Sequence, residues 1–129
     1  MARQVTISIV DDDESVRDGM VTLMQSHGYA AAAFESGEDF LLSDAGDRTG
    51  CLIANMHMRG MTGLELLHRL AASGHSIPAI LITARHDENL RARARQAGAF
   101  CYLAKPFRES DLLNCIRSAL ARRNGEPSP

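Results

Sequence analysis

The sequence lacks the features that mark secreted, membrane-bound or nucleic-acid-binding proteins. No apolar run approaches the roughly 18 residues that cross a membrane, and Met1–Gln4 leads directly into a β-rich segment. We therefore expect no transmembrane helix, no signal peptide and a cytoplasmic location. The net charge is only −2, which gives no electrostatic reason to predict nucleic acid or an anionic membrane as a partner.

Cysteine is scarce and irregularly spaced. The three residues, Cys51, Cys101 and Cys115, are odd in number and form no CxxC motif. This pattern argues against a disulfide framework and predicts reduced thiols. We expect Cys101 and Cys115 to pack in the core rather than to sense redox state. The five histidines lack the spacing of metal ligands and are expected at the surface.

What the sequence does contain is a regular alternation of short β-rich segments and helical patterns. Its 129 residues suffice for one domain with a real core. The expected strands are Val5–Val10, Tyr29–Phe34, Cys51–Ala54, Ala79–Thr83 and Phe100–Ala104. A helical pattern follows each of them, which predicts a parallel sheet with helices on both faces.

The expected helices are bounded by capping and breaking residues. They begin near Asp13, Glu38, Thr62, Asp87 and Glu109, and they end near Gly28, Leu42, Ser73, Gly98 and Asn124. The third helix should bury Leu64, Leu67, Leu70 and Ala71. Residues 1–123 are expected to form the domain, and residues 124–129 a flexible tail or the start of a linker.

Polar residues follow these strands where parallel strands would bring them to one edge. They are Asp11, Asp12 and Asp13 after the first strand, Asn55 after the third, Thr83 ending the fourth and Lys105 after the fifth. Clustered carboxylates need a cation, and oxygen ligands suit Mg²⁺. Thr83 and Lys105 would then hold a tetrahedral oxyanion. The simpler alternative is that Asp11–Asp13 only caps a helix and that Thr83 is an ordinary strand-end hydroxyl.

Four segments together closely resemble the receiver domains of response regulators in two-component signalling. They are IVDDDES at 9–15, MHMRGMTGLEL at 56–66, LITA at 81–84 and YLAKPF at 102–107. The resemblance extends from Val5 to about Ala121. It implies an α/β fold of the flavodoxin-like receiver type, with a doubly wound five-stranded parallel sheet of order 2-1-3-4-5, in agreement with the alternation.

The resemblance also implies a metal site. Asp11 and Asp12 match the acidic pair of the family, with Asp12 as the direct ligand. The backbone carbonyl of His57 would be a further ligand. Asn55 occupies the position of the phosphoacceptor aspartate, which also contacts the metal. From these residues we expect Mg²⁺ to bind weakly.

Three further residues match the part of the site that responds to phosphate. Thr83 resembles the switch hydroxyl, Tyr102 the switch aromatic and Lys105 the phosphoryl-binding lysine. The peptide bond between Lys105 and Pro106 is expected to be cis. Taken alone, Tyr102 would be read as a half-buried strand aromatic.

The sequence departs from the family at two positions. Asn55 is an amide where the family has a nucleophilic carboxylate, and an amide oxygen would not form a stable acyl phosphate. Arg59 stands where the family usually has proline. We expect Arg59 to pair with Asp12 or Asp13 and to replace the metal in part.

The leading hypothesis is a receiver domain that does not take phosphate at Asn55 and acts as a phosphorylation-independent regulator or protein-interaction module, not as an enzyme. One alternative is an Mg²⁺-dependent phosphoacceptor whose aspartate was replaced, naturally or artificially. A remote alternative is a small haloacid-dehalogenase-like phosphatase, whose motif order Asp11-x-Asp13, Thr83 and Lys105 superficially fit.

The expected partner is a sensor histidine kinase or another signalling protein. A homodimer would use the surface of helix four, strand five and helix five, where Arg91, Arg95, Tyr102 and Arg117 lie. We expect this domain to contact neither nucleic acid nor membrane.

Overall fold

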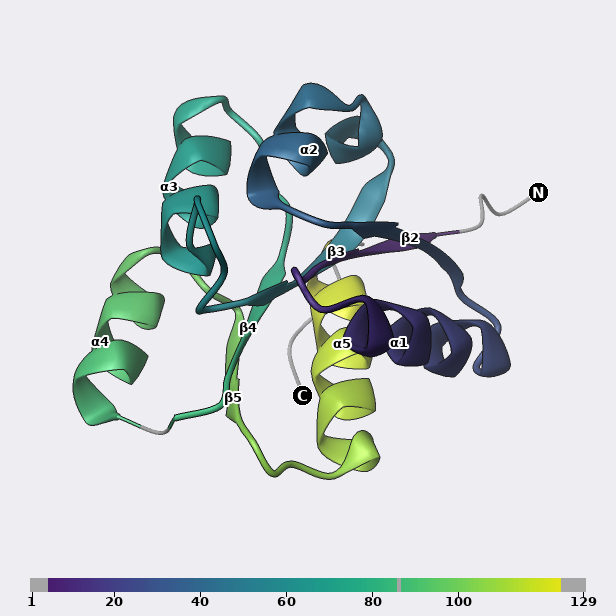
Figure 1. Ribbon diagram of the computed structural model, residues 1–129. Helices are drawn as coiled ribbons and strands as arrows, with labels where there is room; N and C mark the ends of the chain where they lie inside the picture. Colours follow the sequence, from purple (N-terminus) through teal and green to yellow (C-terminus); the bar gives the residue numbers. More distant parts are fainter. Residues whose placement is uncertain (1–4, 86, 124–129) are drawn as a thin grey trace.

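The computed structural model describes residues 5–85 and 87–123, in which strands and helices alternate as predicted (Figure 1). The strands are β1 (Thr6–Val10), β2 (Ala30–Phe34), β3 (Thr49–Asn55), β4 (Ala79–Thr83) and β5 (Cys101–Ala104). The helices are α1 (Glu14–Ser26), α2 (Gly37–Leu42), α3 (Gly63–Ala72), α4 (Glu88–Gln96) and α5 (Glu109–Arg123), with a short 3-10 helix η1 (Ala45–Asp47) before β3. The expected tail, residues 124–129, lies outside the described residues.

The strands form one parallel sheet in the order β2-β1-β3-β4-β5. Figure 1 shows α1 and α5 on one side of this sheet and α2, α3 and α4 on the other. The predicted doubly wound, flavodoxin-like fold is therefore confirmed. In the described residues no helix is both long enough and apolar enough to span a membrane, whereas the cytoplasmic location stays a prediction.

Alternate residues along each strand supply two separate cores, because successive side chains of a strand point to opposite faces of a sheet. Ile9, Ile53 and Ile80 pack with apolar residues of α1 and α5 on one face. Leu52 and Leu81 pack with α2, α3 and α4 on the other face. Removing each such side chain from water contributes about 1.5–3 kcal/mol, so the central strands β1, β3 and β4 hold both layers in place.

Strand β3 is longer than the predicted segment Cys51–Ala54, since it begins at Thr49 and includes Asn55. The hydroxyl of Thr49 lies 2.7 Å from that of Ser8 on β1 and donates to the carbonyl of Ala45 at 2.6 Å. These hydrogen bonds bury a polar residue at the start of the strand. The predicted loop from Ser43 to Gly50 is thus partly strand, because tertiary partners offset the low strand propensity of Gly50.

The buried side of α3 also differs from the prediction. Leu66 is fully buried, whereas Ala71 is exposed. A side chain at Gly37 of α2 would contact Leu66 at 3.6 Å, so Leu66 faces α2. Helix α3 therefore packs against a neighbouring helix as well as against the sheet, which widens its apolar side beyond a single stripe.

Candidate functional site

The polar residues that follow the strands lie at one edge of the sheet. Val10 pairs with Ala54 in the register of β1 and β3, so Asp11 and Asn55 are the next residues of adjacent strands. Thr83 pairs with Ala104 at the ends of β4 and β5, and Lys105 follows directly. Because β1, β3, β4 and β5 are parallel, their carboxyl ends meet at this edge, which is where open α/β sheets bind ligands.

Asp11 and Asn55 are joined by a hydrogen bond. Asn55 donates from Nδ2 to Oδ2 of Asp11 at 3.3 Å, and the backbone N–H of Asp13 donates to Oδ1 of Asp11 at 2.9 Å. Asp11 is only 6% exposed, so its carboxylate needs these donors. The side-chain oxygen of Asn55 accepts from the backbone N–H of His57 at 3.2 Å, which orients the amide group. An amide at position 55 thus offers Asp11 an N–H donor.

Asp12 contacts Arg59 in the loop after β3. The backbone N–H of Arg59 donates to Oδ2 of Asp12 at 3.0 Å, and Nε of the same arginine lies 3.5 Å from that oxygen. The Arg59 side chain is 86% exposed and that of Asp12 is 24% exposed. The ion pair is therefore open to solvent and adds little stability, whereas the backbone hydrogen bond holds the loop against Asp12. Of the two carboxylates considered for Arg59, the structure selects Asp12.

Asp13 takes the simpler of its two predicted roles. It is the N-cap residue of α1, and its Oδ1 accepts from the backbone N–H of Val16 at 3.2 Å. A carboxylate at this position satisfies a free N–H and complements the helix dipole. The side chain is exposed. Asp13 thus belongs to the start of α1 and is not part of the Asp11–Asn55 pair.

Thr83 is fully buried, and its hydroxyl is engaged within the turn after β4. It donates to the carbonyl of Arg85 at 3.0 Å and accepts from the backbone N–H of the same residue at 3.1 Å. The backbone N–H of Lys105 donates to the carbonyl of Thr83 at 2.8 Å. The side chain of Lys105 is exposed, and within the described residues its ammonium forms no ion pair. The peptide bond between Lys105 and Pro106 is cis, as predicted.

Tyr102 lies apart from this edge. It pairs with Leu81 in the middle of the β4–β5 register and is half-buried. The guanidinium of Arg91 on α4 lies 5.5 Å from the centre of its ring, a cation–π contact. Tyr102 therefore connects β5 to α4, and the structure does not bring it next to Asp11 or Asn55.

The two carboxylates at this edge already have hydrogen-bond donors from the chain. Among residues 5–85 and 87–123, no three His, Cys, Asp or Glu side chains lie where they could hold a metal ion together. The carboxylates of Asp11 and Asp12 already accept hydrogen bonds from the chain. Mg²⁺ prefers near-octahedral oxygen ligation, and these hydrogen bonds occupy part of the lone-pair capacity of the two carboxylates. The predicted role of the His57 carbonyl stays a prediction.

Sequence reasoning missed Arg17. Its Nη1 donates to the backbone carbonyl of Asp11 at 2.8 Å, which secures the end of β1 from the first turns of α1. The signal in the sequence is weak, because only the direction of α1 relative to β1 brings position 17 back to residue 11. The guanidinium of Arg17 therefore holds the backbone of Asp11 in place.

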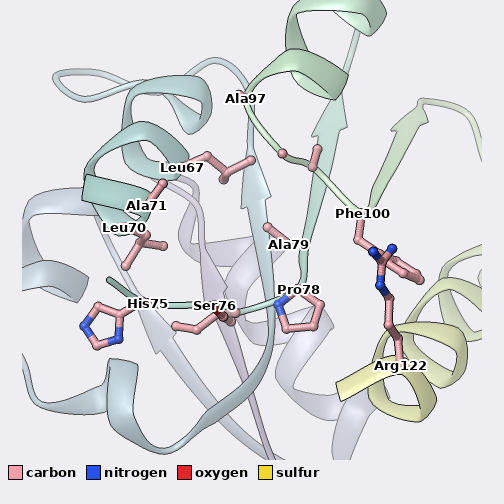
Figure 2. Close-up of a pocket in the computed structure, with 13 residues that line it drawn as sticks. Leu67, Leu70, Ala71, His75, Ser76, Pro78, Ala79, Ala97, Phe100 and Arg122 are labelled. Carbon is pink, nitrogen blue, oxygen red and sulfur yellow. The ribbon is translucent and has the colours of Figure 1, made fainter. Parts of the chain in front are cut away.

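A separate cavity of about 650 Å³ lies at the opposite edge of the sheet, where β4 and β5 begin (Figure 2). Leu67 and Pro78 line it, together with His75 and with Arg122, whose guanidinium lies 5.6 Å from the centre of the Phe100 ring. None of the polar residues at the carboxyl ends of the strands contributes to its wall. The cavity is therefore not part of the candidate site.

Comparison with known proteins agrees with this arrangement. The family model of the response regulator receiver domain matches residues 7–117. The transcriptional regulatory protein TdiR of Thauera aromatica is 38% identical over 116 residues, 90% of this chain and 51% of TdiR. The response regulator protein TmoT of Ectopseudomonas mendocina is 40% identical over 119 residues, 92% of this chain and 54% of TmoT. The chain thus spans about half the length of these relatives.

Solved structures show the same similarity. The response regulator StyR has a TM-score of 0.88 and 38% identity, with 95% of this chain and 62% of that chain covered. The FixJ-N structure has a TM-score of 0.84 and 34% identity, with 92% and 95% covered. These matches give no support to the haloacid-dehalogenase-like phosphatase considered from the sequence.

Proposed function

The chain belongs to the response regulator receiver domain family, and on that premise we propose that it is a receiver that does not accept phosphate at Asn55. The observation that carries this proposal is the hydrogen bond from the Asn55 amide to the Asp11 carboxylate. Position 55 is where the family has its acceptor aspartate. An amide oxygen is too weak a nucleophile to form an acyl phosphate, so the usual transfer step is lost.

We also propose that Mg²⁺ binds weakly at this edge, because the chain supplies part of the positive charge itself. A third carboxylate at position 55 would repel Asp11 and favour a bound cation. The Asn55 amide removes that repulsion and donates an N–H instead. Arg59 brings a guanidinium and a backbone N–H to Asp12. Both changes lower the gain in free energy on binding a divalent ion.

The proposed role is a phosphorylation-independent regulator or protein-interaction module rather than an enzyme. Receiver domains interact with histidine kinases, so a sensor kinase or another signalling protein is the proposed partner. A homodimer would form through α4, β5 and α5, where exposed Arg91 and Arg95 flank Tyr102. Four relatives are named as transcriptional regulatory proteins. We propose that this domain itself, with a net charge of −2, does not contact DNA.

A second candidate is an Mg²⁺-dependent phosphoacceptor that carries an inactivating replacement of aspartate by asparagine. Thr83 and Lys105 favour it, because they remain at the same edge of the sheet, with the cis peptide after Lys105. In this case restoring the carboxylate would restore the chemistry. If the chain is instead a receiver whose whole site has diverged, the loop around Arg59 would hinder phosphate transfer even with a carboxylate at position 55.

Acetyl phosphate with Mg²⁺ tests the proposal, with the intact mass of the protein measured promptly. We expect no phosphoryl adduct on the protein as it stands. The variant Asn55→Asp serves as the matched comparison: an adduct on it would favour the second candidate, and no adduct would favour a site that has diverged as a whole. An adduct on the unaltered chain, for example on Asp12, would overturn the proposal.

A further inference from the structure

The cavity at the edge where β4 and β5 begin stays open because the end of α4 places only small residues there. Its volume is about 650 Å³ (Figure 2). Gly98 follows α4 with a φ of +93°, and a side chain at this position would meet no atom within 4 Å. Ala97 and Ala99, its two neighbours, also line the cavity. The space has the size of pockets that bind small organic molecules, about 300–1,000 Å³.

Apolar side chains form the inner wall of this cavity. Leu67 and Leu70 of α3 line it and are each only 5% exposed. Ile77 and Pro78, which lead into β4, line it as well and are half-buried. An apolar molecule that covers this wall releases the water next to it, which favours binding. The wall therefore suits the hydrocarbon part of a ligand.

One end of the cavity carries a cation. The exposed side chain of Arg122 on α5 lines the cavity, and its guanidinium lies 5.6 Å from the centre of the Phe100 ring (Figure 2). Within residues 5–85 and 87–123 Arg122 forms no ion pair, and no residue that lines the cavity is Asp or Glu. The acidic residues Asp44 and Asp47 line a separate depression, which His75 also borders. The charge at the cavity wall therefore favours an anion.

We propose that this cavity binds a small apolar carboxylate. The carboxylate lies against the guanidinium of Arg122, which can donate two parallel N–H···O hydrogen bonds to it. The contact with the Phe100 ring holds the guanidinium at the cavity. The hydrocarbon part of the ligand covers Leu67 and Pro78. Because Asn55 lies at the opposite edge of the sheet, this binding does not depend on whether the chain accepts phosphate.

The test is an NMR titration of the whole isotope-labelled chain with octanoate, which joins an unbranched apolar chain to one carboxylate. We expect saturable shifts centred on the backbone N–H groups of Ser76, Ile77 and Gly98, with a Kd of about 1 mM for so small a ligand. Octanol has the same length without the charge and should bind at least about fivefold more weakly. The proposal is overturned if no shift saturates, if the shifts centre elsewhere, or if octanol binds as tightly. Shifts of the same signals on raising the protein concentration alone would assign the cavity to a second copy of the chain and would also overturn it.

Variants separate the charged end of the cavity from its apolar wall. Arg122→Gln should weaken octanoate binding at least about fivefold and leave octanol binding unchanged, whereas Arg117→Gln, on the same helix but outside the cavity, should change neither. Ala71→Leu should fill part of the cavity and weaken both ligands. Ala72→Leu is its matched control, because Ala72 is the next exposed residue of α3 and does not line the cavity. Leucine is a good helix former, so both variants should fold. Unchanged octanoate affinity in Arg122→Gln or in Ala71→Leu would overturn the proposal.

Discussion

A single amide group changes the balance of charge at the edge of the sheet. The Asn55 side chain donates to Asp11 at 3.3 Å, where a carboxylate would place a like charge against a residue that is only 6% exposed. Two unit charges about 4 Å apart at an effective dielectric of about 20 repel by about 4 kcal/mol before screening. The amide removes this repulsion and replaces it with a hydrogen bond.

The variant Asn55→Asp should therefore be less stable than the unaltered chain when metal is removed by EDTA. We expect a loss on the order of 1 kcal/mol, because solvent screens most of the repulsion between the two carboxylates. Urea denaturation measures the free energy of unfolding. The control Asn55→Ala removes the amide without adding charge, so Asn55→Asp should fall below it. Equal free energies of unfolding for Asn55→Asp and Asn55→Ala would show that the added charge does not cause the loss of stability.

The sequence predicts which residues lie at the candidate site better than it predicts their hydrogen-bond partners. Asp11 and Asn55 are predictable because they end parallel strands that must meet at one edge. The contact of Arg59 with Asp12 was expected as one of two options. The local turn that engages the Thr83 hydroxyl with Arg85 and the approach of Arg17 to β1 were not predicted. Both contacts depend on the direction that the backbone takes after a strand ends, and the spacing of apolar residues does not predict that direction.

Among the elements, α3 shows how capping fixes the loop after β3. Thr62 is its N-cap, and the capping box with Glu65 is complete, with hydrogen bonds of 3.0 and 3.2 Å. These bonds to Thr62 lower the pKa of Glu65. A side chain at Gly63 would meet the carbonyl of Asn55 at 2.6 Å, so only glycine lets α3 begin this close to the site.

Thr62→Ala should lower the free energy of unfolding by about 1 kcal/mol, since the N-cap loses its acceptor oxygen. Thr62→Ser is the matched control and should stay within about 0.5 kcal/mol of the unaltered chain, because it keeps the hydroxyl. Thermal or urea unfolding of the three proteins measures the difference. A Thr62→Ala protein as stable as the original would mean that α3 is held by packing alone.

At the scale of the whole molecule, the resemblance to receiver domains implies the order of the strands, while the lengths of some elements do not follow from the sequence. Alternation of strand and helix predicts the parallel sheet with helices on both faces. The early start of β3 at Thr49 depends on a hydrogen bond to Ser8 of β1, which lies 41 residues away in the sequence, as well as on the nearby carbonyl of Ala45. The burial of Leu66 depends likewise on the position of α2. The pattern of residues within one segment does not predict contacts with a distant segment.

The surface of α4, β5 and α5 is the proposed docking face. Reversing the charge of Arg91 and Arg95 together, as R91E and R95E, should weaken self-association or partner binding at least about tenfold. Arg93→Glu is the control, because it lies on the same helix but about half a turn away, and it should change little. Sedimentation over a range of concentrations measures self-association. Association unaffected by the double reversal would contradict this face, and a strictly monomeric protein would contradict the homodimer.

The measurement that tests the central claim most directly is the effect of Mg²⁺ on the stability of the unaltered chain and of Asn55→Asp. If the chain neutralises its own carboxylates, millimolar Mg²⁺ should stabilise the unaltered protein by less than about 0.4 kcal/mol, the value reached when its concentration equals Kd. Asn55→Asp should gain about 1.4 kcal/mol if its Kd is about ten times below that concentration. Urea midpoints in EDTA and in Mg²⁺ provide both values. An unaltered chain that Mg²⁺ stabilises as strongly as Asn55→Asp would contradict the account.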